Sequence, residues 1–351
     1  MAVSPVFICG CGAVSPAGWG AGALREALAR GQRLPATELA RPGWPHPFRV
    51  RTVPAPSPRP RVLTHPRLRR TSPIAQHAVA AALEALGSDA ARLGGAASRL
   101  GIVLCVMSGC VNYSRRFYDE TLKDPATASP LVFPETVFNA PASHLAAVLG
   151  TTAINYTLVG DPGAFLQGLA LAADWLLAGR VDGCLVIAAE EIDWLSAEAF
   201  ALFDRTVILS EGAAALYLRR EAAQQPGVRL AAITRPYLFF DAQSRARAAE
   251  RAKAELGPGA PDHLLCDGLQ AAPRTDRAEA LAWQDWSGAR LSPKVVLGEG
   301  LMAAAAWQCV AAFDSLRAGS YPAATNSVVG CNEQAIAVRF ITHPSHPCAL
   351  Y

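Results

Sequence analysis

Short apolar runs alternate with helical segments along the whole chain, and this alternation most constrains the fold. Five runs in the first part have the length and β-forming content of buried strands: 6–9, 100–107, 155–159, 184–189 and 212–218. Helical apolar spacing lies between and beside them, over 21–29, 72–86, 112–123, 140–149, 165–179 and 196–203. Strands that alternate with helices are typical of parallel or mixed sheets covered by helices on both faces. We therefore expect an α/β protein.

The second part of the chain repeats this pattern in shorter form. Its expected strands are 228–233, 263–266, 293–297 and 335–340, and its expected helices are 245–256, 275–286 and 301–316. Residues 322–326 read as a turn, and the proline-rich stretch 33–66 reads as an irregular surface loop. The repetition predicts two similar halves, residues 1–221 and 222–351.

Composition excludes several classes of protein. Hydrophobic residues make up 51% of the 351 residues, charged residues 17%, and the net charge is +3, which indicates a well-buried globular protein and argues against a nucleic-acid partner. We find no apolar run long enough to span a membrane, and the first five residues carry no basic leader. Nine cysteines occur without CxxC pairs, so we expect no metal site and a reduced, cytoplasmic protein.

Residues 155–165 predict a strand, a sharp turn and the start of a helix. Asp161 is a good N-cap residue, and Pro162 suits the first helical position, where its missing N–H costs nothing. A strand that turns into a helix N-terminus is a natural place for a nucleophile, because it exposes one side chain beside free amides. A proline at that place is the feature to explain. The earlier glycine-rich turn over 10–20 lacks the dinucleotide-binding spacing, so we expect no cofactor.

Five stretches together resemble the β-ketoacyl-acyl-carrier-protein synthases of the thiolase superfamily. They are 6–19, 67–70 with the helix that follows, 155–165 with 182–190, 210–214, and 292–306 with 323–326. The resemblance covers most of the chain and implies a thiolase-like five-layered αβαβα fold from two similar halves.

The resemblance also implies where the family's catalytic groups would stand. The nucleophilic cysteine position falls on Pro162, and the two histidine positions fall on Asp267 and Glu299. Only Lys294 matches a family active-site residue, and the glycine-rich gating loop is altered at residues 328–332. Proline has neither a thiol nor an N–H to donate to an oxyanion. We therefore expect the condensing activity to be lost, with Lys294, Glu299 and Asp267 left as a buried, compensated cluster.

A folded but inactive synthase implies a partner role, like that of a chain length factor. The expected partners are an active ketosynthase, in a heterodimer, and an acyl carrier protein with its acyl chain, in polyketide, polyene or fatty acid biosynthesis. By family analogy the strand 154–158 pairs across the dimer axis, and the apolar segment 133–142 reaches the acyl tunnel. The candidate tunnel or interface residues are Phe133, Phe138, Ile154, Tyr156, Leu158 and Phe165.

Three arginines, Arg67, Arg69 and Arg70, form either a solvated surface or a docking site for the acidic carrier protein. Two other functions stay open. One is a free-standing hydrolase or decarboxylase that uses Asp267, Lys294 and Glu299. The other is a homodimeric protein that binds an acyl chain or its carrier.

Overall fold

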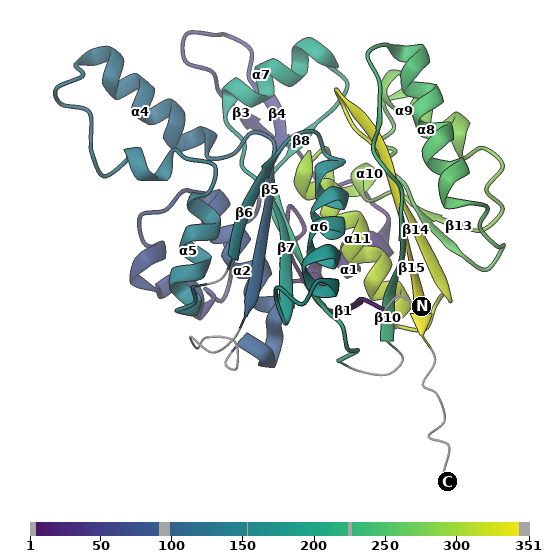
Figure 1. The fold of residues 1–351 in the computed structure, drawn as a ribbon. Coiled ribbons are helices and arrows are strands. Elements are labelled where there is room, and N and C mark those ends of the chain that lie inside the picture. Colours follow the sequence, from purple (N-terminus) through teal and green to yellow (C-terminus); the bar gives the residue numbers. More distant parts are fainter. Residues whose placement is uncertain (1–4, 91–98, 153, 224–226, 344–351) are drawn as a thin grey trace.

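One continuous mixed β-sheet of twelve strands forms the centre of the molecule (Figure 1), and its two halves, here called the first and the second sheet, are joined where β1 pairs antiparallel with β10. The computed structural model describes residues 5–90, 99–152, 154–223 and 227–343, so the residues 1–4, in which we expect no leader, lie outside it. The first sheet has the order β1-β9-β7-β5-β6. Its strands are β1 (Phe7–Ser15), β5 (Leu100–Val106), β6 (Ile154–Val159), β7 (Gly183–Glu190) and β9 (Gly212–Arg219). Strand β5 pairs parallel with β6 and β7, whereas β9 pairs antiparallel with β7 and β1.

The second sheet repeats this topology strand for strand. Its order is β10-β15-β14-β12-β13. Its strands are β10 (Gly227–Ile233), β12 (Leu264–Cys266), β13 (Ala289–Leu291), β14 (Ala323–Val329) and β15 (Gln334–His343). The parallel and antiparallel pairings match those of the first sheet position by position. The expectation of two similar halves is therefore confirmed.

Helices fill the space between the two sheets and cover their outer faces. Helices α6 (Ala164–Leu177) and α11 (Met302–Arg317) lie between the sheets (Figure 1). Helices α2 (Pro73–Leu86) and α5 (Ala140–Leu149) cover the first sheet, and α8 (Ala242–Leu256) and α9 (Pro273–Ala282) cover the second. Helix α1 (Ala21–Arg30) packs on β1 and α11. These are the five layers that the resemblance implies.

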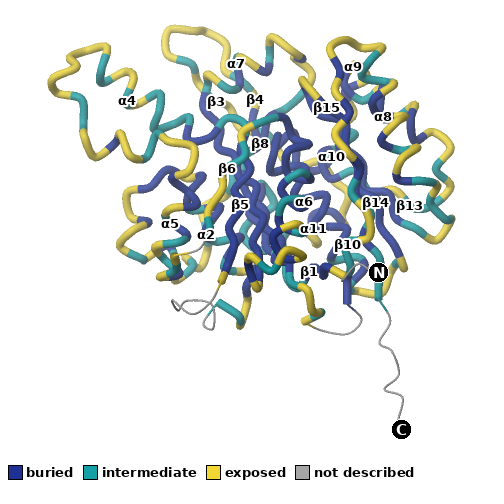
Figure 2. Tube along the Cα trace, viewed as in Figure 1, coloured by how far each residue is buried: buried dark blue, intermediate teal, exposed yellow. Residues whose placement is uncertain are grey.

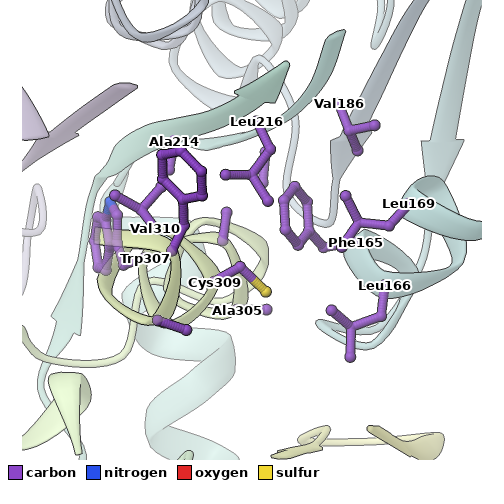
Figure 3. Close-up of a cluster of buried hydrophobic side chains, with 14 of the residues drawn as sticks. Phe165, Leu166, Leu169, Val186, Ala214, Leu216, Ala305, Trp307, Cys309 and Val310 are labelled. Atoms are coloured by element: carbon purple, nitrogen blue, oxygen red, sulfur yellow. The ribbon is translucent and has the colours of Figure 1, made fainter. Parts of the chain in front are cut away.

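The core continues from one half into the other (Figure 2). Helix α11 is apolar on nearly every side and is almost completely buried, as expected for a helix enclosed by two sheets. Its Trp307 donates from Nε1 to the carbonyls of Val14 and Ala213, each 3.2 Å away. Phe165 and Leu166 of α6 belong to the same buried cluster as Trp307 (Figure 3). Both halves thus contribute to one shared core. The expected boundary between the halves, after residue 221, stays a prediction.

Three sequence expectations about local structure are wrong. Residues 33–66 contain strands β3 (Thr37–Leu39) and β4 (Phe48–Arg51), which form a small sheet with β8 (Leu209–Ser210), followed by the 3-10 turns η1 (Arg61–Thr64) and η2 (Pro66–Leu68). Residues 293–297 form a short helix, α10 (Pro293–Leu297), instead of a strand. Residues 322–326 are not a turn, because β14 starts at Ala323 between β12 and β15.

The remaining elements lie at the edges of this framework. They are β2 (Gly18–Trp19), η3 (Gly87–Asp89), α4 (Val111–Lys123), η4 (Phe133–Glu135), α7 (Trp194–Phe203) and β11 (Tyr237–Leu238). Among the described residues, no helix is long and apolar enough to cross a membrane.

Candidate functional site

Asp161 and Pro162 lie in the turn between β6 and α6, at the position expected for a nucleophile. Helix α6 begins at Ala164, whose N–H donates to the main-chain carbonyl of Asp161 over 2.8 Å. The expectation that the Asp161 side chain caps this helix is wrong. Its carboxylate is buried and accepts hydrogen bonds from three successive amides of a turn in the second half, those of Asn332, Glu333 and Gln334, over 3.1–3.2 Å.

The turn 330–334 is therefore fastened to the helix start. The thiol of Cys331 lies 3.2 Å from Oδ1 of Asp161. A Cβ on Gly330 would stand 1.6 Å from Oδ2 of Asp161, so only glycine lets the turn approach this closely. This turn follows β14 and includes the altered part of the expected gating loop. It covers the place where a nucleophile would need free space.

Lys294 and Glu299 form a buried ion pair beside this turn. Nζ of Lys294 lies 2.7 Å from Oε2 of Glu299, and Oε1 of Glu299 accepts from the N–H of Leu301 over 2.8 Å. Burial lowers the pKa of Lys294, but the charge of Glu299 and its hydrogen bond outweigh burial, so the pKa is raised. The carboxylate of Glu299 thus has a partner at each oxygen, and the ammonium of Lys294 is neutralised by Glu299.

Asp267 stands slightly apart, at the end of β12. Oγ of Ser292 donates to its Oδ1 over 2.5 Å, and the guanidinium of Arg290 lies 3.6 Å from its Oδ2. Burial raises the pKa of Asp267, while these hydrogen bonds and Arg290 oppose the rise. Lys294 and Glu299 are thus in contact, as expected, whereas Asp267 is ion-paired with Arg290 instead of Lys294.

Sequence reasoning missed Glu279, a buried acid on α9. Its Oε1 accepts from the N–H of Gly268 over 3.1 Å. Burial, followed by the charge of Asp267, raises the pKa of Glu279 to about 7. A signal was available in the sequence, because Glu279 shares one helical face with Thr275, Ala278 and Ala282, all of which are buried.

Two more buried acids lie at the end of β7: Glu190 is its last residue, and Glu191 follows it. Glu190 accepts from the amides of Met107 and Ser108, and burial raises its pKa to about 8. Glu191 accepts from the amides of Asn112 and Ile74 and from the hydroxyl of Ser72. These contacts fix the start of α4 and of α2, so both acids support the frame around the pocket.

Almost no free space remains beside the ion pair. The cavity there, which Lys294, Glu299, Glu279, Arg245 and Cys331 help to line, has a volume of about 10 Å³. That is the least that holds a single water molecule. Two larger cavities open outward, one of about 590 Å³ beside Phe239, Arg245 and Cys331 and one of about 220 Å³ beside Met107 and Cys331. Cys331 lines all three, so the turn that Asp161 holds lies where these cavities adjoin.

Strand β6 is an edge strand, with nothing paired on its outer side in the described part of the chain. Ile154, Tyr156 and Leu158 alternate along it on the side of α6. Tyr156 is 52% exposed and contacts Trp175 of α6 edge-on. These three expected interface residues therefore lie where a second chain could add a strand.

The segment 111–138, here called the α4 arm, stands on the same side of the molecule as β6 (Figure 1). Helix α4 has no buried residue. Large apolar side chains are exposed along the arm: Tyr118, Leu122, Leu131, Phe133, Val137 and Phe138. At its base, Nε2 of His144 lies 2.8 Å from Oε1 of Glu135, and the ring of Phe138 lies against Gly109. The arm is thus a fixed support for exposed apolar groups.

Phe165, one of the expected tunnel or interface residues, is completely buried among the side chains of the shared core (Figure 3). It is therefore not exposed on the outer surface, and its role in a tunnel stays a prediction. Arg67, Arg69 and Arg70 are exposed on both sides of the buried Leu68. Within the described residues these three arginines make no ion pair, which is consistent both with a solvated surface and with a docking site for the carrier protein.

No group of three potential metal ligands gathers anywhere in the described part of the chain. In sequence, no family model matches the chain, and no curated protein matches it.

Solved structures do match over nearly the whole length. The ishigamide ketosynthase/chain length factor aligns with a TM-score of 0.79 at 21% identity, covering 96% of this chain and 99% of that one. A β-ketoacyl synthase from Burkholderia phymatum gives 0.76 at 17% identity, covering 97% and 99%. A type II polyketide synthase ketosynthase, bound to the hexaketide and in complex with its acyl-carrier protein, gives 0.75 at 17% identity with the same coverage. The chain has the fold of these proteins, and the expected thiolase-like fold is confirmed.

Proposed function

We propose that this chain is a non-catalytic, ketosynthase-like subunit that pairs with an active β-ketoacyl synthase in polyketide, polyene or fatty acid biosynthesis. The observation that carries the proposal is the state of the pocket. The position that the family resemblance assigns to the nucleophile holds Pro162, and the space beside the Lys294–Glu299 pair is a cavity of about 10 Å³. A thiol, a neutral base and room for an acyl group are what condensation needs.

The outer surface supports a partner role. An edge strand with unpaired amides and carbonyls is a template for strand addition. Strand β6 and the α4 arm stand on the same side of the molecule in Figure 1, and the arm carries exposed apolar groups. Exposed apolar patches of this kind mark protein interfaces. A ketosynthase partner that carries its own cysteine and histidines would supply the chemistry.

Within such a pair, this chain would shape the tunnel that limits the growing acyl chain. Phe133 and Phe138 are the proposed tunnel residues, since they are large, apolar and exposed at the base of the arm. Arg67, Arg69 and Arg70 are the proposed contacts for the acidic carrier protein, since they are exposed cations without carboxylate partners in the described residues.

The test is co-expression with an intact ketosynthase from the same gene neighbourhood, with an affinity tag on this chain alone. We expect the two chains to co-purify in equal amounts. Tyr156→Asp places a charge on the edge strand and should weaken the pair at least about 30-fold, the effect of losing a contact worth about 2 kcal/mol. Phe240→Asp is the matched control, because Phe240 is an exposed aromatic residue at the start of α8.

Product mass spectrometry of the pair tests the tunnel role. We expect Phe133→Ala or Phe138→Ala to change the product length while the amount of co-purified synthase stays constant. The proposed heterodimer is excluded if the chain purifies as a stable homodimer that does not bind the synthase. Turnover by the purified single chain, lost in Lys294→Ala, would instead establish an enzyme with a repurposed pocket.

A further inference from the structure

A further cavity opens between α7 and the small sheet of β3, β4 and β8, outside the pocket described above. It has a volume of about 690 Å³, which lies within the range of small-molecule sites in proteins. Helix α7 packs against β4 (Figure 1), and residues 205–209, which follow the helix, line the cavity together with both elements. We call this cavity the α7 groove.

The inner surface of the α7 groove is apolar. Phe48 of β4, Phe200 of α7 and Leu209 of β8 line it, and all three belong to or pack on one cluster of buried hydrophobic side chains. Leu202 lines it as well and is 81% exposed. A ligand with an apolar body would cover this surface and remove it from water.

Trp44 gives the α7 groove an aromatic wall. The guanidinium of Arg41 lies 4.9 Å from the centroid of the Trp44 ring and 5.3 Å from that of Trp194. Arg41 is itself ion-paired with Glu198 of α7, so the ring of Trp44 is held in place. The residue is nevertheless 54% exposed. A fixed and accessible aromatic ring of this kind suits contact with an apolar or planar group.

The charges around the α7 groove are unbalanced. Arg49 and Arg205 both line it, both are exposed, and neither makes an ion pair with any described residue. Glu198 is the one acid among the described lining residues, and Arg41 already engages it. Two guanidinium groups therefore remain available for an anion beside an apolar surface.

We propose that the α7 groove binds a carboxylic acid with an apolar body. The body would lie on the apolar surface and against Trp44, and the carboxylate would pair with Arg49 or Arg205, since a planar guanidinium suits two carboxylate oxygens. The body can be an aliphatic chain or a planar aromatic ring system. No residue of β6 or of the α4 arm lines the groove, so the inference does not depend on the proposed partner surface.

The test is calorimetric titration of the full chain with octanoate and with 2-naphthoate at constant ionic strength. We expect saturable binding of at least one acid. The neutral alcohol with the same body, 1-octanol or 2-naphthol, should bind about fivefold more weakly, the effect of losing one exposed ion pair. Tighter binding of octanoate indicates an aliphatic ligand, and tighter binding of 2-naphthoate indicates an aromatic one.

Variants of the lining residues place the acid in the α7 groove. Arg49→Gln combined with Arg205→Gln removes both available charges and should weaken acid binding about fivefold. Trp44→Ala should weaken it by a similar factor, and Trp44→Phe, which keeps an aromatic wall, by less. Arg61→Gln is the control, because Arg61 is an exposed arginine outside the groove, and it should bind the acid as the wild type does.

Arg274→Gln combined with Arg277→Gln tests the cavity of about 590 Å³, which these two exposed arginines line. If this pair of changes weakens acid binding and the changes in the α7 groove do not, then the acid occupies the other cavity and the proposal is wrong. It is also wrong if the wild type shows no saturable binding of either acid, or if the alcohols bind as tightly as the acids.

Discussion

Asp161 shows how one buried carboxylate can hold a turn from the other half of the chain in place. Its carboxylate accepts from three backbone amides and the Cys331 thiol, so it takes the place that a bound anion would have in such a turn. We expect Asp161→Ala to lower the free energy of unfolding by about 3 kcal/mol, because it leaves buried N–H groups without acceptors. Asp161→Asn, which keeps one oxygen, should cost less.

Chemical denaturation of the two variants measures this difference, and Asp174→Ala is the control, since Asp174 is exposed on the same helix. Loss of the carboxylate should also make the thiol of Cys331 react faster with a thiol reagent, because the turn is released. If Asp161→Ala is as stable as Asp174→Ala, then the turn is held by something other than this carboxylate.

Glu279 gives the folded chain a pH dependence of known sign. Its pKa is raised from 4.5 to about 7, so the folded state binds its proton more tightly than the unfolded state does. The stability that this proton contributes is present below pH 4.5 and is lost as the pH rises through about 7. Its full size is at most about 3 kcal/mol.

Glu279→Gln removes this titration. We expect the free energy of unfolding of the wild type to fall more steeply between pH 5 and pH 8 than that of the variant, as measured by urea unfolding at each pH. Parallel curves for the two proteins would show that Glu279 titrates alike in the folded and unfolded chain.

At the scale of elements, the contact between Gly330 and Asp161 joins the turn after β14 to the start of α6. A methyl group on Gly330 would collide with the Asp161 carboxylate. We expect Gly330→Ala to cost about 1–3 kcal/mol in the wild type, as is usual for a forced overlap in a packed region. The same change should cost clearly less in an Asp161→Ala background, where the colliding oxygen is gone.

A double-mutant cycle by denaturant unfolding measures that coupling. If the losses of unfolding free energy in the two single variants simply add in the double variant, then the destabilisation by Gly330→Ala does not come from overlap with the Asp161 carboxylate.

The elements that could be predicted are those whose sequence pattern is repeated over many residues. The runs at β5, β7 and β9 are apolar on both faces, which predicts buried strands. The apolar run of α11 is too long for a strand, which predicts a buried helix. Residues 293–297 form a helix instead of the expected strand, because five apolar residues are too few to distinguish a buried strand from a buried helix. The leading Pro293, which suits a first helical turn, was the available signal for the helix.

Other elements and contacts depend on partners far away in the sequence. Strand β14 begins with alanines and is a strand only because β12 and β15 enclose it. The family resemblance assigns Pro162, Lys294 and Glu299 to catalytic positions, which stays a prediction, whereas the expected contact of Lys294 with Glu299 is present in the structure. The bonds from Asp161 to the turn 332–334 have no local signal in the sequence, because their two ends lie about 170 residues apart.

For the whole molecule, the shared core makes the two halves interdependent. The buried cluster that contains Phe165 and Trp307 takes side chains from both repeats (Figure 3). We expect residues 1–221, expressed alone, to unfold without a sharp cooperative transition, because α6 would lose its contact with α11 and expose a large apolar face.

Thermal unfolding monitored by circular dichroism, with dye binding as a report of exposed apolar surface, checks this expectation for each half against the full chain. A sharp transition in the isolated first half would show that residues 1–221 are an independent domain.

The turn held by Asp161 also bears on how such a chain can change over time. In the proposed function, regaining condensation would require a thiol in place of Pro162, two histidines in place of Asp267 and Glu299, and removal of the carboxylate that fixes the turn. Changes at Asp161, Asp267 or Glu299 would each disturb a buried contact, and none of them alone would supply the missing thiol. A single substitution in this chain is therefore expected to return no condensing activity.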